Sequence, residues 1–183
     1  MPKKPAILNQ KIVANSRLFK VEALHLQFSN GTETHYERLV SSSHGAVLVI
    51  AINHSGEALL IREYAAGTHR YELGLPKGRI EQGEDPLQAA NRELREETGH
   101  GANKLERLMS LTLAPGYFDH ATHVILAQEL YSERLPGDEP EPIEVIKWPL
   151  NRLPELMARD DLTEARSIAA LFLAQQHLMD QSE

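Results

Sequence analysis

The stretch GRIEQGEDPLQAANRELREETGH, residues 78–100, decides the fold of this chain. It begins as a loop, because its first two glycines and the charged residues between them follow neither a helical nor a strand period. A helix follows: Asp85 can cap its N-terminus, Pro86 suits its first turn, and Gln88 completes a capping-box pattern with Asp85. Gly99 is placed to end this helix in a left-handed conformation. We therefore predict a loop that leads into one helix ending at Gly99.

Three glutamates, Glu93, Glu96 and Glu97, lie near the C-terminal end of the predicted helix. Glu93 and Glu97 repel each other at one-turn spacing, and the C-terminal end of a helix already carries partial negative charge. Each effect costs only about a few tenths of a kcal/mol on an exposed surface, so a solvated acidic face is one interpretation. The other is a bound divalent cation, because Mg²⁺ and Mn²⁺ prefer hard oxygen ligands and retain waters for substrate phosphates.

The spacing of the whole stretch favours the cation. Its specified residues are Gly78, Glu84, Arg92, Glu93, Leu94, Glu96, Glu97 and Gly99. These intervals resemble the Nudix box at every specified position except the last, where His100 stands in place of a bulky aliphatic residue. The chain is therefore similar to the Nudix hydrolases. The rest of the sequence can be tested for agreement with this resemblance.

The resemblance implies a role for most residues of the box. The implied ligands of Mg²⁺, or of Mn²⁺ in its place, are Gly78 through its carbonyl group, Glu93, Glu96 and Glu97. Arg92 is implied to pair with Glu84 and so to hold the loop on the helix, and both are counted with Glu97 in the catalytic machinery.

The composition is that of an ordinary globular protein. The chain has 183 residues, 42% of them hydrophobic and 25% charged, which suits one domain or a domain with an elaboration. A formal net charge of -7 argues against a nucleic-acid duplex or an anionic membrane as partner. The absence of cysteine excludes disulfides, thiolate catalysis and cysteine-based zinc sites. No apolar segment is long enough for a signal peptide or a membrane span, so we expect a cytoplasmic protein.

The N-terminal region predicts a small β-structure. Residues 6–40 alternate apolar and polar side chains around a turn at residues 29–31, which indicates an antiparallel hairpin. Ser41–Ser43 resembles a linker, so we divide the chain into a β-hairpin region, residues 1–43, and a Nudix domain, residues 44–183. A hairpin with one apolar face must bury that face, and members of the resembled family exchange such elements in dimers. A homodimer is therefore expected.

The rest of the chain predicts an α/β fold with a mixed sheet. Strands are expected at residues 46–52, 57–62, 105–113, 122–130 and 143–148, and helices at 150–158 and 164–179. Residues 63–77 and 136–142 are interpreted as polar loops. Strands on both sides of a central helix place helices on the faces of the sheet. This agrees with the α/β/α sandwich that the Nudix resemblance implies.

Two further features narrow the resemblance to the ADP-ribose pyrophosphatase branch, and most closely to ADP-compound hydrolases of the NudE type. Residues 61–64 resemble the branch's strand motif, and Pro115 resembles its marker proline. Two positions depart from the pattern: His120 stands where an acidic residue is usual, and Gly74 where glutamate is common, with Glu72 nearby. The implied reaction is metal-dependent hydrolysis of the pyrophosphate in ADP-ribose, NADH or diadenosine polyphosphates, releasing AMP.

Such a hydrolysis requires a general base for the attacking water. Family analogy indicates Glu139 first and Glu141 second, although each is also interpretable as part of a solvated acidic loop. Arg62 and Arg70 could contact substrate phosphates, with a surface role as the alternative for Arg70. Tyr64 could either pack or stack on adenine.

Two other functions stay open from the sequence. A non-catalytic Nudix module that senses ADP-ribose or NAD-like ligands would usually lack box glutamates, all of which are present here. A sugar-nucleotide or nucleoside-triphosphate pyrophosphatase would use the same box on another small-molecule substrate.

Overall fold

The computed structural model describes residues 3–40 and 44–181 of the chain. Contacts divide the chain into two units, one of residues Met1–Gly45 and Thr112–Ala121, the other of Ala46–Leu111 and Thr122–Glu183. The linker expected at Ser41–Ser43 lies outside the described residues. The sequence does not predict that Thr112–Ala121 belongs to the smaller unit. This segment lies between two strands of the larger unit and is far in sequence from the N-terminal strands.

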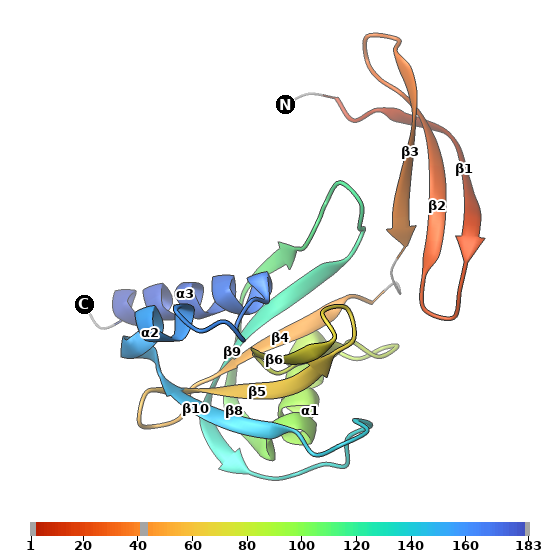
Figure 1. Ribbon diagram of the computed structural model, residues 1–183. Helices are drawn as coiled ribbons and strands as arrows, with labels where there is room; N and C mark the ends of the chain where they lie inside the picture. The colour runs from red at the N-terminus through yellow and green to blue at the C-terminus, as the bar shows by residue number, and fades with distance from the viewer. Residues whose placement is uncertain (1–2, 41–43, 182–183) are drawn as a thin grey trace. The chain divides into compact units, whose positions relative to one another are not determined.

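The smaller unit is a three-stranded antiparallel sheet and not the predicted two-stranded hairpin (Figure 1). Its strands, in spatial order, are β1 (Ala6–Asn15), β2 (Lys20–Gln27) and β3 (Glu33–Val40). The first turn contains none of the glycine, proline or asparagine signals of a hairpin. There the Ser16 hydroxyl accepts a hydrogen bond from the Phe19 N–H at 2.9 Å, and the Ser16 N–H donates to the Phe19 carbonyl at 2.8 Å. The second turn has the predicted glycine, Gly31, at a φ of 84°.

The segment from residue 112 to residue 121 joins this unit at the end of β3. The Leu39 N–H donates to the Tyr117 carbonyl at 2.7 Å, and Leu39 forms a parallel bridge with Phe118. This pairing extends the sheet by a segment that is remote in sequence.

The larger unit is built around β4 (Ala46–Ala51), which is buried throughout, as its continuous apolar sequence predicts. Leu48 and Ile50 belong to a core on the side of α3 (Ala165–Asp180), whereas Val47 and Val49 belong to a core on the side of α1 (Pro86–Thr98). The short helices η1 (Leu150–Arg152) and α2 (Leu153–Met157) also belong to the α3 side. These layers confirm the predicted α/β/α sandwich (Figure 1).

Two sheets form the middle layer. One has the order β7 (Lys77–Arg79), β4, β9 (Ala121–Ser132), β8 (His100–Thr112). The other has the order β10 (Glu144–Pro149), β5 (Glu57–Ala65), β6 (Arg70–Gly74). β4 runs parallel to β9 and antiparallel to β7, so the layer is mixed, as predicted.

Two local predictions were wrong, and a third is met with a different kind of helix. Residues 63–77, interpreted as a loop, contain β6 and the start of β7, whose extended conformation comes from pairing with β5 and β4. β8 begins at His100, directly after the helix, and not near residue 105. The helix expected at residues 150–158 is a 3₁₀ turn followed by a short α-helix with Pro154 in its first turn. Among the helices of the described residues, none has the length and apolar character of a membrane span.

Candidate functional site

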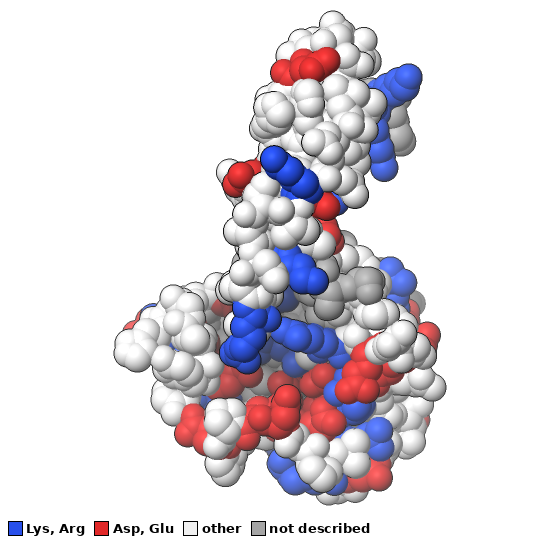
Figure 2. Space-filling model, turned by 90° about the vertical axis from the view of Figure 1, so that its right-hand side faces the viewer, with Lys and Arg blue, Asp and Glu red and all other residues white. Residues whose placement is uncertain are grey.

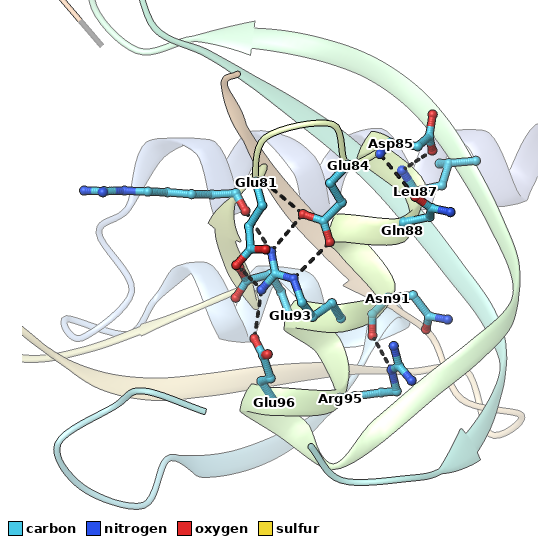
Figure 3. A network of polar contacts seen from close by, with 11 residues as sticks. Glu81, Glu84, Asp85, Leu87, Gln88, Asn91, Glu93, Arg95 and Glu96 are labelled. Atoms are coloured by element: carbon cyan, nitrogen blue, oxygen red, sulfur yellow. Dashed lines mark hydrogen bonds and ion pairs between the residues drawn. The ribbon is translucent and has the colours of Figure 1, made fainter. Parts of the chain in front are cut away.

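Helix α1 has the predicted caps. The Asp85 carboxylate accepts a hydrogen bond from the Leu87 N–H at 2.8 Å, and the Gln88 side chain accepts one from the Asp85 N–H at 3.3 Å (Figure 3). Gly99 ends the helix with a φ of 74°. These caps fix both ends of α1, so the positions of the glutamates along it are determined by local sequence.

Arg92 is the centre of a polar network that joins the loop before α1 to the helix. Figure 3 shows its partners Glu84, Glu93 and Glu96. Its guanidinium group donates to both carboxylate oxygens of Glu84, at 2.9 and 3.1 Å, and to the Arg79 carbonyl at 2.9 Å. The structure therefore contains the implied Glu84–Arg92 pair. Arg92 also donates to Glu93 at 2.8 Å and to Glu96 at 2.9 Å, and it holds the pKa of Glu84 below its usual value.

Two of the box glutamates are more buried than the sequence suggested. Glu93 is 9% exposed and Glu97 is 4% exposed, which the interpretation as a solvated acidic face does not allow for. Burial raises the pKa of Glu93 to about 7 and that of Glu97 to about 8. The Glu97 carboxylate also accepts a hydrogen bond from the Lys77 N–H at 2.9 Å. A negative charge buried in this way is costly unless a cation lies beside it.

Gly78 lies directly against one of these carboxylates. A Cβ atom added at Gly78 would overlap the carboxyl group of Glu93, so any other residue here would displace it. The main chain of β7 and the end of α1 are thus in close contact, which only glycine allows.

The donors of this site fit a hard divalent cation. Carboxylate and carbonyl oxygens are the ligands that Mg²⁺ prefers, and Glu93 and Glu97 are buried with little compensating charge beyond Arg92 and Lys77. Within residues 3–40 and 44–181, no three acidic or histidine side chains are arranged so that they could bind a metal ion together without moving. Here Glu93 and Glu96 both accept hydrogen bonds from Arg92.

A pocket of about 230 Å³ contains several of the other predicted residues. It is lined by Arg62, Glu63, Tyr64, Tyr71, Glu139, Pro140, Glu141, Pro142, Ile143 and Glu144. Glu139 lies close enough to the box for its negative charge to contribute, after burial and the nearer charges, to the raised pKa of Glu93. Glu141 instead accepts a hydrogen bond from the Tyr71 hydroxyl at 2.6 Å. Figure 2 shows acidic and basic side chains interleaved over one face of the larger unit.

The predicted substrate contacts have different partners. Arg62 donates to Glu144 at 2.9 Å and to Asp161 at 2.6 Å. Arg70 pairs with Glu72 at 2.7 Å and also donates to Thr163. The Tyr64 ring lies edge-on to Tyr71, with ring centroids 5.8 Å apart, and its hydroxyl contacts His69 at 2.5 Å. Pro115 belongs to the smaller unit.

Sequence reasoning missed three residues that bind the predicted ones. Tyr71 contacts Glu141, Asp161 contacts Arg62, and the Lys77 N–H donates to Glu97. For Tyr71 a signal existed: Tyr71 and Leu73 alternate with charged residues, as in a strand, but the run is too short to distinguish from a turn.

A larger cavity of about 620 Å³ lies at η1 and α3, and none of its lining residues is charged. It therefore lacks the groups that a pyrophosphate would need.

Comparison with known proteins finds matches to both the N-terminal region and the larger part of the chain. Residues 42–171 match the model of the NUDIX domain, and residues 5–38 match that of the NudE-type Nudix hydrolase N-terminal domain. The chain is 48% identical to the ADP compounds hydrolase NudE of Escherichia coli (strain K12), over 97% of this chain and 95% of that protein. It is 30% identical to the ADP-ribose pyrophosphatase of Bacillus subtilis (strain 168), over 90% and 91%. A crystal structure of an ADP compounds hydrolase superposes with a TM-score of 0.92 at 48% identity, covering 99% of this chain and 97% of the other.

Proposed function

We propose, from the premise that this chain belongs to the Nudix hydrolase family and is a NudE-like pyrophosphatase of ADP compounds, that it cleaves ADP-ribose, NADH and diadenosine polyphosphates. Each cleavage would break the pyrophosphate bond and release AMP together with a second phosphate compound. The observation that carries the proposal is the pair of buried glutamates, Glu93 and Glu97, at the end of α1 beside the main chain of Gly78.

The cofactor in this proposal is Mg²⁺, or Mn²⁺ in its place. Gly78, Glu93, Glu96 and Glu97 would hold it. When bound, a divalent cation neutralises pyrophosphate oxygens and lowers the pKa of a coordinated water. Burial of Glu93 and Glu97 supports this assignment, because it leaves their negative charges in need of compensation. Arg92 and Glu84 would keep the loop and the helix in register around the site.

The protein itself must remove a proton from the attacking water. We assign this step to Glu139, because it lines the pocket and its charge acts on Glu93, whereas the Glu141 carboxylate accepts a hydrogen bond from Tyr71. The phenol hydroxyl occupies a carboxylate oxygen of Glu141, which leaves Glu141 less available to an attacking water.

The ADP moiety is assigned to the pocket that Glu139 also lines. Tyr64 is about half exposed there and offers its ring for stacking on adenine. Arg62 lines the same pocket and is the proposed phosphate contact, with Arg70 as a second cation on the neighbouring strand. Pro115 is retained as the marker for ADP-ribose-like substrates, on family analogy alone.

A substrate panel with product identification tests the proposal. ADP-ribose, NADH and diadenosine polyphosphates should each yield AMP with Mg²⁺, and hydrolysis should stop when the metal is chelated. Sugar nucleotides and nucleoside triphosphates are the comparison substrates. A kcat/KM that is higher for either of those than for every ADP compound would overturn the substrate assignment.

We further propose that residues 1–43 form a dimerisation element and residues 44–183 the catalytic domain. Support comes from the apolar side chains of the N-terminal sheet, where Ile7 is 54%, Ile12 50% and Phe19 58% exposed. Exposed apolar side chains in such number mark a surface that another chain covers.

A further inference from the structure

The segment that carries Glu139 has no regular secondary structure of its own. Residues 133–143 connect β9 to β10, and no helix or strand extends into this stretch. Three prolines, Pro136, Pro140 and Pro142, lack the N–H groups that could pair with a neighbouring strand. A catalytic group on such a segment depends on a few side-chain contacts for its position.

One such contact joins the segment to the sheet. The hydroxyl of Tyr71 donates to the Glu141 carboxylate at 2.6 Å, across 70 residues of sequence. Tyr71 itself is well placed, because it lies on β6 opposite Tyr64 on β5 and its ring meets the Tyr64 ring edge-on. The phenol is therefore a fixed point to which the segment is attached.

Glu139 lies two residues before that attachment. A Cβ atom at Gly137 would overlap the Glu139 carboxylate, so the chain folds closely around this side chain. Two residues of chain span no more than about 7 Å, so a fixed Glu141 limits the space that Glu139 can reach. Downstream, Arg62 holds Glu144 at the start of β10.

We propose that Tyr71 and Glu141 are positioning residues: their hydrogen bond fastens the segment so that Glu139 stays opposite the box glutamates. Glu141 is then an anchor and not a second base. This inference rests on the proposed function, in which Glu139 accepts the proton. In this assignment the hydroxyl group of Tyr71 holds Glu141, while its ring packs edge-on against Tyr64.

Four variants separate the anchor from a second base: Tyr71→Phe, Glu141→Ala, the double variant, and Glu141→Gln. Steady-state hydrolysis of ADP-ribose with saturating Mg²⁺ gives kcat and KM, and amide hydrogen exchange of Gly137, Asp138 and Glu139 reports the mobility of the segment. A single exposed hydrogen bond is worth about 0.5–1.5 kcal/mol, which converts to roughly 2- to 12-fold in the population it controls.

We expect Tyr71→Phe and Glu141→Ala each to lower kcat by roughly 2- to 12-fold, with little change in KM, and to speed exchange in the segment. The double variant should be no worse than either single variant, because one contact is lost in all three. Glu141→Gln should stay close to wild type, since its amide oxygen can still accept the phenol proton. Glu155→Ala removes an exposed carboxylate on α2 and serves as the matched control, with unchanged kinetics.

Glu139→Gln keeps failure of this inference distinct from failure of the proposed function. If Glu139→Gln is fully active, the assigned base is wrong and the anchor has nothing to position. If Glu139→Gln loses about 10²-fold or more in kcat while Tyr71→Phe matches wild type in kcat and exchange, the base stands and the anchor is overturned. A Glu141→Gln variant as impaired as Glu139→Gln would likewise overturn it, because Glu141 would then act as a base.

Discussion

At the scale of single residues, Glu97 is the most buried carboxylate among the described residues and also has a defined chemical task in the proposed function. Its side chain is 4% exposed, and burial raises its pKa to about 8. We expect Glu97→Gln to fold at least as stably as wild type, because it removes a group whose ionisation is penalised by burial and can still accept the Lys77 N–H. Its kcat should fall by about 10²-fold or more, the scale of a lost electrostatic contact in the transition state. Thermal melts and kinetics at saturating Mg²⁺ measure both effects.

The same variant has a readout that does not depend on turnover. Added Mg²⁺ should raise the melting temperature of wild type through preferential binding to the folded state, and should raise that of Glu97→Gln much less. Near-normal activity of Glu97→Gln at saturating Mg²⁺ would contradict the assignment of this residue to the metal site.

Gly78 offers a second test at the residue scale. In Gly78→Ala the new methyl group would overlap the Glu93 carboxyl group, so either β7 or the glutamate must move. We expect a loss of about 1–3 kcal/mol in the free energy of unfolding, typical of overpacking, together with weaker Mn²⁺ binding in a titration. Gly67→Ala is the matched control, since a Cβ there would meet no atom within 4 Å. Equal behaviour of the two variants would show that the close contact has no consequence.

At the scale of secondary-structure elements, Asp161 ties the connection between α2 and α3 to the central sheet. Its carboxylate accepts from Arg159 at 2.7 Å and from Arg62 on β5 at 2.6 Å, and its carbonyl accepts from the Leu73 N–H on β6 at 2.7 Å. Arg159 and then Arg62 hold the pKa of Asp161 well below its usual range. Asp161→Asn keeps the shape of the side chain but removes its charge, and we expect it to cost about 1–3 kcal/mol at pH 7.

The pH dependence of that cost follows from the direction of the shift. A depressed folded-state pKa contributes stability that is fully present above the unfolded value of about 3.9 and is lost as the pH falls through the folded value. The difference in unfolding free energy between wild type and Asp161→Asn should therefore be constant from pH 7 to 5 and shrink below about pH 4. Urea melts at pH 7, 5 and 3.5 measure it, and a difference that grows on acidification would contradict the ion-pair account.

The elements also differ in how far the sequence could predict them. Helix α1 was predictable because Asp85, Gln88 and Gly99 define its ends locally. β7 was not, because Lys77–Arg79 contains no apolar side chain and is extended only through its pairing with β4. Likewise the box glutamates were identified by their spacing, whereas their burial depends on elements that pack over α1 from elsewhere in the chain. The contact of Tyr71 with Glu141 depends on tertiary structure alone.

At the scale of the whole molecule, the net charge opposes the proposed substrates. The chain carries a formal charge of -7, and ADP compounds are themselves anions. Attraction must therefore be local, and three cations close to the box and the pocket are already paired: Arg92 with three glutamates, Lys77 with Glu63, and Arg62 with two carboxylates. A bound divalent cation would supply the missing positive charge where the pyrophosphate must lie. An acidic box on an acidic protein can therefore bind an anionic substrate through the cation that it holds.

The other property at this scale is the expected homodimer. In the N-terminal sheet, Ile7 lies opposite Leu26 and Ile12 lies opposite Glu22, so both isoleucines share a face with the buried Leu24. Both are half exposed, and covering them at about 25 cal/mol per Å² of apolar surface favours association.

Light scattering or sedimentation of the full chain at micromolar concentration should show a dimer, and a chain starting at Ser43 should be monomeric. Ile12→Lys should weaken the dimer while leaving the melting temperature of the larger unit unchanged. Lys11→Gln, on the opposite face of β1, is its control. A full-length protein that stays monomeric under these conditions would rule the dimer out, and the apolar face would then need another cover.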